Sequence, residues 1–246
     1  MEEKGTSQAM TPPVLLLIFN RPDHTAAVME RIREAKPPKL FVGADGPRSG
    51  HEEDNALCVQ AREIATDVDW DCQMHTLFRD ENLGCKQAVG SAITWFFDNV
   101  DAGIILEDDC IPHPSFFPYC TELLRRYDDD DRIFTISGNN YQGAQRRTES
   151  SYYFSRYMHC WGWATWSRAW EHYVPRLEHW DRICSEEWLY QLFDSPRSAR
   201  YWTKIFNRVD AGEVDTWDYI WQYHIWLQSG LNIIPERNLV ENIGFG

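Results

Sequence analysis

The sequence predicts an α/β protein in which a mostly parallel central sheet is flanked by helices. Short apolar segments that suit strands recur in the first half of the chain, at Pro13–Phe19, Leu40–Gly43, Cys72–Phe78 and Ile104–Leu106. The first is a continuous apolar run, as expected for a strand buried on both faces. Segments with apolar residues three or four positions apart lie between them, as in amphipathic helices. Strands that alternate with helices at this spacing are typical of parallel sheets.

The expected helices have recognisable starts. One opens at Pro22, one spans Leu57–Ile64, one follows Gly84, and one runs from Pro114 to Tyr127. Proline favours the first turn of a helix, where its missing N–H leaves no hydrogen bond unmade. Each helix therefore separates two expected strands or follows the last of them.

The second half has a different character. We expect a strand at Arg132–Ser137, a polar loop over Gly138–Ser150 and an aromatic strand at Tyr152–Tyr157. Helical segments rich in tryptophan follow, among them Ser198–Val209 and Trp217–Leu227.

No repeat, low-complexity tract or flexible linker separates the two halves. Residues 12–246 are therefore expected to form one domain, with a first half at 12–110 and a second half at 111–246. The polar residues 1–11 are expected to be a disordered tail.

Charge and composition exclude several classes of protein. The 246 residues include 24 Lys and Arg against 38 Asp and Glu, so the net charge is 24 − 38 = −14. Such a chain repels a phosphate backbone, and a nucleic-acid partner is not expected. The 43% hydrophobic residues are enough for a core. The longest apolar run, Val14–Phe19, is too short to cross a bilayer, so no transmembrane segment is expected.

The N-terminal residues and the cysteines indicate a cytoplasmic protein. Glu2, Glu3 and Lys4 do not form the basic start of a signal peptide. The seven cysteines form no Cys-x-x-Cys pair, which favours buried reduced thiols over a disulfide or zinc framework.

Aromatic residues are unusually frequent, with 12 Trp, 11 Tyr and 12 Phe, and ten of the twelve tryptophans lie between Trp161 and Trp226. Most are expected in the core. Aromatic faces also stack on the apolar faces of sugar rings, so a few in a groove would suit a carbohydrate.

Three polar groups follow the expected parallel strands. They are Asn20-Arg21, Asp45 and the triplet Glu107-Asp108-Asp109. Ligands of open parallel sheets bind beyond the carboxyl ends of the strands, so we expect a site at this edge.

The triplet Glu107–Asp109 is the strongest motif. Like charges at one place are unfavourable unless a cation or donors compensate, and Mg²⁺ and Mn²⁺ prefer oxygen ligands. The alternative is a solvated acidic turn, which is our interpretation of Asp128–Asp131 because no apolar strand leads into that run.

The order of motifs resembles glycosyltransferases of the GT-A fold, a nucleotide-diphospho-sugar transferase fold. An apolar strand enters Glu-Asp-Asp, followed by Pro-x-Phe-Phe, then Ile136–Asn140 (Ile-Ser-Gly-Asn-Asn), then Trp161–Trp166 (Trp-Gly-Trp-Ala-Thr-Trp). The sequence is most similar to the N-acetylglucosaminyltransferase I-like branch and its bacterial relatives, from Pro13 to Gly246. The resemblance implies that residues 12–110 bind a nucleotide sugar and residues 111–246 bind the acceptor.

This resemblance also implies roles for the residues at the sheet edge. The last carboxylate, Asp109, would bind a divalent metal, Mn²⁺ or Mg²⁺. Glu107 and Asp108 would contact the donor sugar and ribose, Arg21 with its neighbour Asn20 would reach the nucleotide, and Asp45 would accept a hydrogen bond from uracil. For Arg21 and Asp45 the alternative is an ordinary turn residue.

Lys86 is a candidate phosphate ligand because it lies at the start of the helix after Gly84. Free N–H groups and the helix dipole favour anions at such a position. An exposed lysine with no ligand is the alternative. The absence of a P-loop or Rossmann glycine pattern argues against those cofactor sites.

Transfer with inversion needs a base near the acceptor hydroxyl. Asp218 matches the catalytic Asp of the similar family, and Asp215 is the second candidate. Either residue could instead only cap a helix. Trp161 and Trp217 are expected on the acceptor side.

The first hypothesis is a metal-dependent inverting glycosyltransferase. It would move a sugar, with N-acetylglucosamine the first guess, from a UDP-sugar to a hydroxyl of a glycan or protein acceptor. One alternative is a sugar nucleotidyltransferase, although the expected glycine-rich basic loop is missing from Phe19–Pro22. A non-catalytic carbohydrate-binding module on the same fold is the other.

Overall fold

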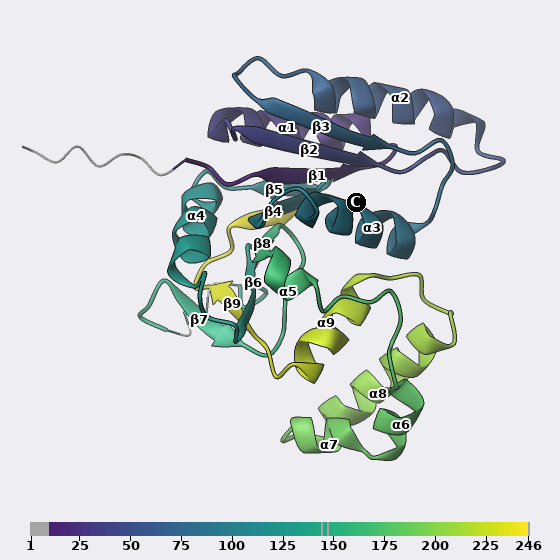
Figure 1. Ribbon diagram of the computed structural model, residues 1–246, viewed down its shortest axis with the longest axis vertical. Helices are drawn as coiled ribbons and strands as arrows, with labels where there is room; N and C mark the ends of the chain where they lie inside the picture. Colours follow the sequence, from purple (N-terminus) through teal and green to yellow (C-terminus); the bar gives the residue numbers. More distant parts are fainter. Residues whose placement is uncertain (1–9, 144, 147, 246) are drawn as a thin grey trace, which may run out of the picture.

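The computed structural model describes residues 10–143, 145–146 and 148–245 (Figure 1). Residues 1–9 of the expected tail lie outside this part of the chain, whereas Thr11 Oγ1 donates a 2.9 Å hydrogen bond to the Ala35 carbonyl. The strands are β1 (Val14–Ile18), β2 (Lys39–Ala44), β3 (Gln73–Phe78), β4 (Ala102–Glu107), β5 (Cys110–Pro112), β6 (Ile133–Ser137), β7 (Tyr152–Ser155), β8 (Trp163–Trp166), β9 (Leu231–Pro235) and β10 (Val240–Asn242). The helices are α1 (Pro22–Ala35), α2 (Glu52–Thr66), α3 (Cys85–Phe97), α4 (Phe116–Arg126), α5 (Ser167–Trp170), α6 (Trp180–Ser185), α7 (Trp188–Leu192), α8 (Pro196–Asp210) and α9 (Asp218–Leu227).

One large sheet runs through both halves of the chain. Within the described residues it has eight strands in the order β3-β2-β1-β4-β8-β6-β9-β7. Strands β3, β2, β1 and β4 are mutually parallel, and β6 is parallel to β9. Strand β8 is antiparallel to β4 and β6, and β7 is antiparallel to β9. The expected fold class, α/β with a mostly parallel sheet flanked by helices, is confirmed.

The side chains of β1 alternate between two apolar layers. Val14, Leu16 and Ile18 pack with residues of α1, α2 and α4, whereas Leu15 and Leu17 pack with residues of α3, α5 and α9. Figure 1 shows α1 and α2 on one side of β1–β3 and α3 on the other. Burial on both faces accounts for the unbroken apolar run of β1.

Strand β8 was not predicted. All four of its residues are buried, so no alternation of polar and apolar residues marks it as a strand. It lies between β4 and β6, and Trp163 and Trp166 fill the two opposite layers. The Trp-rich segment is therefore mainly core, with Trp161 just outside the strand.

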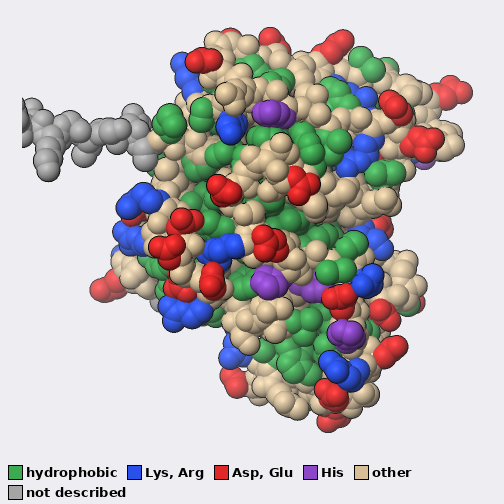
Figure 2. Space-filling model, in the orientation of Figure 1, with side chains coloured by type: hydrophobic (Ala, Val, Ile, Leu, Met, Phe, Trp, Pro, Cys, Tyr) green, Lys and Arg blue, Asp and Glu red, His purple; other side chains and the backbone are tan. Residues whose placement is uncertain are grey.

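Helices α6, α7 and α8 form a lobe that packs against α9. Their shared core contains Trp180, Phe206, Tyr223 and Trp226. In Figure 1 this lobe lies at the bottom of the view, and Figure 2 shows hydrophobic side chains among charged ones on its surface.

The longest described helices, α2 and α8, have 15 residues each and carry several charged residues. A helix needs about 20 mostly apolar residues to cross a bilayer. Within the residues that the structure describes, no helix is long and apolar enough to do so.

A small second sheet returns the end of the chain to the acidic triplet. Strand β10 pairs with β5 in antiparallel register, with Asn242 opposite Cys110. Beyond the pair, the Ile243 N–H donates a 2.9 Å hydrogen bond to the Asp109 carbonyl. Residues 242–245 therefore lie against the predicted site.

Candidate functional site

A cleft of about 410 Å³ opens at the carboxyl ends of β1, β2 and β4. The residues expected to bind a nucleotide sugar at this edge all line it: Asn20, Arg21, Asp45, Glu107 and Asp108. The parallel strands bring these residues together because their carboxyl ends meet at one edge of the sheet. Cleft residues that the sequence analysis did not select include Phe19, Arg48, Arg79, Asn82 and Cys85.

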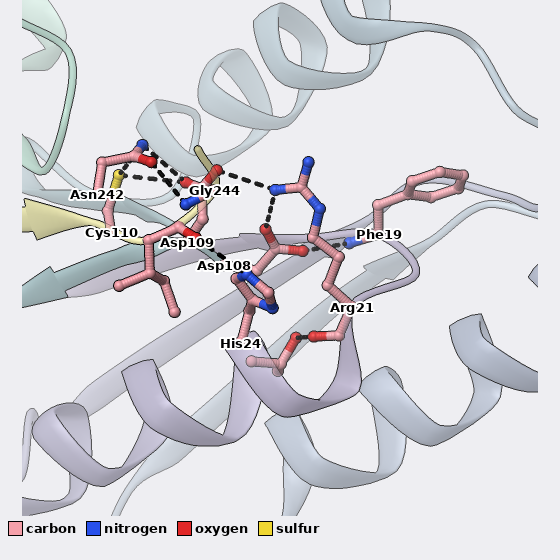
Figure 3. A network of polar contacts seen from close by, with 10 residues as sticks. Phe19, Arg21, His24, Asp108, Asp109, Cys110, Asn242 and Gly244 are labelled. Carbon is pink, nitrogen blue, oxygen red and sulfur yellow. Dashed lines mark hydrogen bonds and ion pairs between the residues drawn. The ribbon is translucent and has the colours of Figure 1, made fainter. Parts of the chain in front are cut away.

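A single guanidinium joins two carboxylates of the acidic triplet (Figure 3). Arg21 Nη1 lies 2.9 Å from Asp109 Oδ2 and 3.6 Å from Asp108 Oδ1. The Phe19 N–H donates a 3.3 Å hydrogen bond to Asp108 Oδ2. Arg21 thus compensates part of the negative charge at the end of β4 and does not reach Glu107 in a direct ion pair.

The pKa values of Glu107 and Asp108 are raised. Desolvation, and after it the charges of Asp109, Asp108 and Asp218, raise the pKa of the Glu107 carboxyl to about 8 against the attraction of Arg21. Desolvation also raises the pKa of Asp108 to about 6. At neutral pH Glu107 therefore holds a proton unless a cation is close.

Glu107 and Asp108 line the cleft, whereas Asp109, the expected metal ligand, is not among its described lining residues. Among the described residues, no group of three or more His, Cys, Asp or Glu side chains is arranged to hold a metal by itself. Asp109 Oδ2 pairs with Arg21, and Asp109 Oδ1 accepts a 3.3 Å hydrogen bond from Asn242 Nδ2. Mg²⁺ in phosphate-transfer sites is typically held by one or two carboxylates together with substrate phosphates, so an incomplete protein ligand set suits it.

Asp45 joins β2 to the loop before α3. Its Oδ1 accepts hydrogen bonds from the N–H groups of Gly46 at 2.9 Å and Leu83 at 3.0 Å. Asn82 Nδ2 donates a 2.9 Å hydrogen bond to the Gly46 carbonyl. A side chain at Gly46 would meet the Glu81 backbone at 2.4 Å, so only glycine fits there. Asp45 therefore fixes one wall of the cleft.

A buried carboxylate, Asp54, organises the other wall. It accepts hydrogen bonds from Asn20 Nδ2 at 2.8 Å and from Arg48 Nε at 2.7 Å. The Arg48 bond holds the pKa of Asp54 well below its usual range. The Arg48 guanidinium also lies 5.5 Å from the centre of the Phe19 ring. Sequence analysis missed Arg48 and Asp54 because neither ends a strand nor lies in a motif.

The start of α3 differs from expectation. Lys86 does not line the described cleft, and its N–H donates a 3.2 Å hydrogen bond to Asp215 Oδ1. Asp215 Oδ2 lies against Gly84, where an added Cβ would be 2.6 Å away. A carboxylate of the chain therefore lies where the sequence predicted a phosphate. Nothing in the local sequence identified this partner, which lies 129 positions away.

Asp218 begins α9 and is half-buried. Its Oδ1 accepts a hydrogen bond from Thr216 Oγ1. The charge of Asp218 helps to raise the pKa of Glu107 and the pKa of Cys85. Desolvation is the main cause at Cys85, whose pKa is raised to about 12. Asp218 is therefore within electrostatic reach of Glu107 and Cys85, which both line the cleft, but it is not itself among the described lining residues.

The two tryptophans expected on the acceptor side have different surroundings. Trp217 is only 3% exposed and stacks on Trp163 at 5.6 Å, so the prediction that it contacts an acceptor is wrong: its ring is part of the core. Trp161 is half-buried, with its ring 4.9 Å from that of Tyr141 and 5.5 Å from that of Phe245.

Fold and site together define an α/β protein with a cleft at the carboxyl ends of its parallel strands, and the described lining of this cleft includes three carboxyl groups (Asp45, Glu107, Asp108) and three arginines (Arg21, Arg48, Arg79). No family model matches the sequence, and no curated protein matches it. The chain is similar to the solved structure of HddC from Yersinia pseudotuberculosis complexed with GMP-PN, with 10% identity and a TM-score of 0.34 over 52% of this chain and 58% of that one. It is similar to UDP-glucose pyrophosphorylase complexed with UDP-glucose, with 11% identity and a TM-score of 0.39 over 68% of this chain and 80% of that one. It is also similar to the inositol-1-phosphate CTP transferase from T. maritima (8%, 0.37, 67% and 74%). The match spans less than two thirds of HddC, and these likenesses assign no activity to this chain.

Proposed function

We propose that this protein is a metal-dependent inverting glycosyltransferase of the N-acetylglucosaminyltransferase I-like branch. It moves a sugar from a UDP-sugar to an acceptor hydroxyl in the cytoplasm, and N-acetylglucosamine is the first donor sugar to test. The observation that carries this function is the set of carboxyl groups at the end of β4: Glu107 and Asp108 line the cleft, and desolvation, together with the charges of Asp109 and Asp218, raises the pKa of Glu107 to about 8.

Charge supports the use of a metal. The donor is a strongly anionic diphosphate, and the chain carries a net charge of −14. Arg21 is shared by two carboxylates, so little of its charge remains for a phosphate. A divalent cation held by Asp109 would offset the repulsion between the carboxylates of the triplet and the repulsion between these carboxylates and the diphosphate. When bound, it would also neutralise the diphosphate as it leaves.

In this proposal the residues that line the cleft hold the donor. Glu107 and Asp108 contact the donor sugar and ribose, and Asp45 accepts a hydrogen bond from the base in addition to those from Gly46 and Leu83. Arg48 and Arg79 line the same cleft and add cationic donors to Asn20 and Arg21. Holding the donor against several fixed groups lowers the entropic part of the barrier.

Asp218 is the proposed base. The acceptor oxygen forms a bond to the anomeric carbon while the bond from that carbon to the diphosphate oxygen breaks. The bonding electron pair leaves with the diphosphate, and the hydroxyl proton moves to an Asp218 carboxylate oxygen. Thr216 positions this carboxylate by donating its hydroxyl hydrogen to Oδ1.

A sugar nucleotidyltransferase is the second candidate. The matched structures include a UDP-glucose pyrophosphorylase and a CTP transferase, and their names agree with this alternative better than with a glycosyltransferase. Such an enzyme would join a sugar phosphate to a nucleoside triphosphate and release pyrophosphate. The segment Phe19–Pro22, which lines the cleft with three of its residues, contains no glycine to approach a triphosphate closely.

Two product assays separate these activities. The full chain is incubated with Mn²⁺ and a panel of UDP-sugars while release of UDP is measured, and separately with UTP and sugar 1-phosphates while pyrophosphate is measured. Metal-dependent UDP release supports the glycosyltransferase. Pyrophosphate release without UDP release supports the nucleotidyltransferase instead. Neither product, together with glycan binding that is indifferent to metal, would indicate a carbohydrate-binding module.

A further inference from the structure

Four ring side chains form a patch near the acidic triplet Glu107–Asp109. We call Tyr141, His159, Trp161 and Phe245 the aromatic patch. The Tyr141 ring lies 4.6 Å from that of His159 and 4.9 Å from that of Trp161, and the Phe245 ring lies 5.5 Å from Trp161. Tyr141 is 56% exposed and Phe245 is 78% exposed. Large aromatic surfaces left open to solvent in this way commonly mark a binding site.

Asn139 bonds to the His159 ring and to the backbone of Trp161. Its side-chain Oδ1 accepts a 3.2 Å hydrogen bond from the backbone N–H of Trp161, and its backbone carbonyl accepts a 2.9 Å hydrogen bond from His159 Nδ1. Because Nδ1 donates, Nε2 of the neutral His159 ring is left as a hydrogen-bond acceptor. Burial lowers the pKa of His159 and favours this neutral ring.

The Asn139 side chain also lies near the Tyr141 hydroxyl. The residue is 1% exposed. Its amide lies close enough to that hydroxyl to lower the pKa of the phenol, which burial raises overall to about 12. Asn139 therefore contacts three of the four patch members, Tyr141, His159 and Trp161.

The patch adjoins the groups proposed for chemistry. Phe245 follows Gly244 directly, and a Cβ added to Gly244 would be 2.2 Å from Asp109 Oδ2 (Figure 3). Cys160 lies between His159 and Trp161, and the charges of Asp218 and Glu107 add to the effect of burial in raising the pKa of its thiol. The patch is therefore within electrostatic reach of both the triplet and Asp218.

We propose that the aromatic patch binds a neutral pyranose ring of the acceptor, which makes the acceptor a glycan. The C–H face of the ring lies on Tyr141, Trp161 and Phe245, and ring hydroxyls donate to His159 Nε2 or bond to the Tyr141 hydroxyl. The nearby carboxylates disfavour sugar acids by like-charge repulsion. The term acceptor rests on the proposed function, whereas binding of a sugar by the patch does not.

The test measures sugar binding by saturation-transfer NMR on the full chain, without donor or metal. The probes are methyl β-D-glucopyranoside, methyl β-D-galactopyranoside, methyl N-acetyl-β-D-glucosaminide and the matched acid methyl β-D-glucuronide. The variants are Tyr141→Ala and Phe245→Ala, which change exposed rings and leave the half-buried Trp161 intact. Tyr190→Ala is the control, because Tyr190 is 42% exposed but belongs to α7. Mn²⁺-dependent binding of UDP is measured separately on every variant.

The expected result is transfer to at least one neutral glycoside and none to the glucuronide. Tyr141→Ala and Phe245→Ala each weaken glycoside binding about fivefold or more. Tyr190→Ala changes glycoside binding less than about twofold, and the affinity for UDP changes less than about twofold in every variant. No glycoside binding by the parent chain, or equal binding in the patch variants, would overturn the sugar site even if UDP binds. Glycoside binding that depends on the patch, without any UDP binding, would retain the sugar site and contradict the proposed function.

Discussion

The chain carries two runs of acidic residues, Glu107–Asp109 and Asp128–Asp131, and the structure gives them opposite environments. The first follows a buried strand into a cleft, where desolvation raises the pKa of Glu107 to about 8. The second lies beyond α4, where a hydrogen bond from Arg132 lowers the pKa of Asp130 to about 2. Asp128, Asp129 and Asp131 are exposed. The comparison shows that the run at the end of a buried strand is desolvated, whereas the run beyond α4 is mostly exposed to solvent.

The largest expected effect tests whether Asp218 belongs with the first run. Asp218→Asn keeps the size of the side chain but removes the proton acceptor. We expect the rate of sugar transfer to fall by about 10²- to 10⁴-fold, the usual contribution of a general base. Mn²⁺-dependent binding of UDP should stay unchanged by titration calorimetry. A variant with full transfer activity would remove Asp218 from the mechanism.

A matched pair of substitutions compares the two runs directly. Asp109→Asn should reduce metal-dependent UDP release by on the order of 100-fold, because the remaining amide is a weak ligand for a hard cation. Asp129→Asn makes the same chemical change in the exposed run and should leave the rate unchanged. Equal losses in both variants would mean that the two runs do not differ in function.

The third prediction is that Glu107→Gln makes the folded protein more stable, whereas most substitutions in a protein core make it less stable. The pKa of Glu107 is about 8 in the folded protein, against 4.5 for an ordinary Glu. As the pH rises from 4.5 to 8, the unfolded chain releases this proton first, so the folded state loses stability over that range. Glu107→Gln cannot ionise and should be more stable than the parent at pH 8 by about 1–2 kcal/mol, or ~2–4 °C in Tm for each kcal/mol.

Thermal unfolding at pH 5 and pH 8, without added metal, checks this sign. The advantage of Glu107→Gln should be small at pH 5, where the parent Glu107 is protonated in the folded state, and should grow toward pH 8. An advantage that shrinks with rising pH would show that Glu107 is not held in a desolvated, negatively charged site.

The smallest effect concerns the exposed run. The Asp130–Arg132 pair stabilises the folded state above the ordinary Asp pKa of 3.8, and this contribution is lost as the pH falls through about 2. Both partners reach solvent, so Arg132→Gln should lower the free energy of unfolding at pH 7 only marginally. Urea titration measures the change. A loss as large as that of a core substitution would show that the second run is also a structured site.

The part of the molecule that sequence could predict is the part governed by local patterns. The apolar runs of β1 and β4 predicted a sheet edge, and the residues that end them, Arg21 and Glu107, line one cleft. Strand β8 was missed because burial on both faces removes alternation. Trp217 was assigned to the acceptor side, yet its stacking on Trp163 depends on tertiary packing, of which the sequence carries no local sign.

Long-range partners account for the other gaps. The Asp215 carboxylate reaches the start of α3 from 129 positions away, and Asn242 reaches Asp109 from 133 positions away. Asn20 Nδ2 donates a hydrogen bond to Asp54, which lies 34 positions away. Each contact joins segments whose own sequences carry no signal for the other, so only the folded chain reveals them.

The central claim is that this cleft binds a nucleoside diphosphate only through a divalent cation. Titration of UDP into the full chain, with Mn²⁺ and then with EDTA, tests it most directly. The account predicts saturable binding with Mn²⁺ and loss of that binding in EDTA. Equal affinity for UDP in EDTA, or no binding in saturating Mn²⁺, would contradict it.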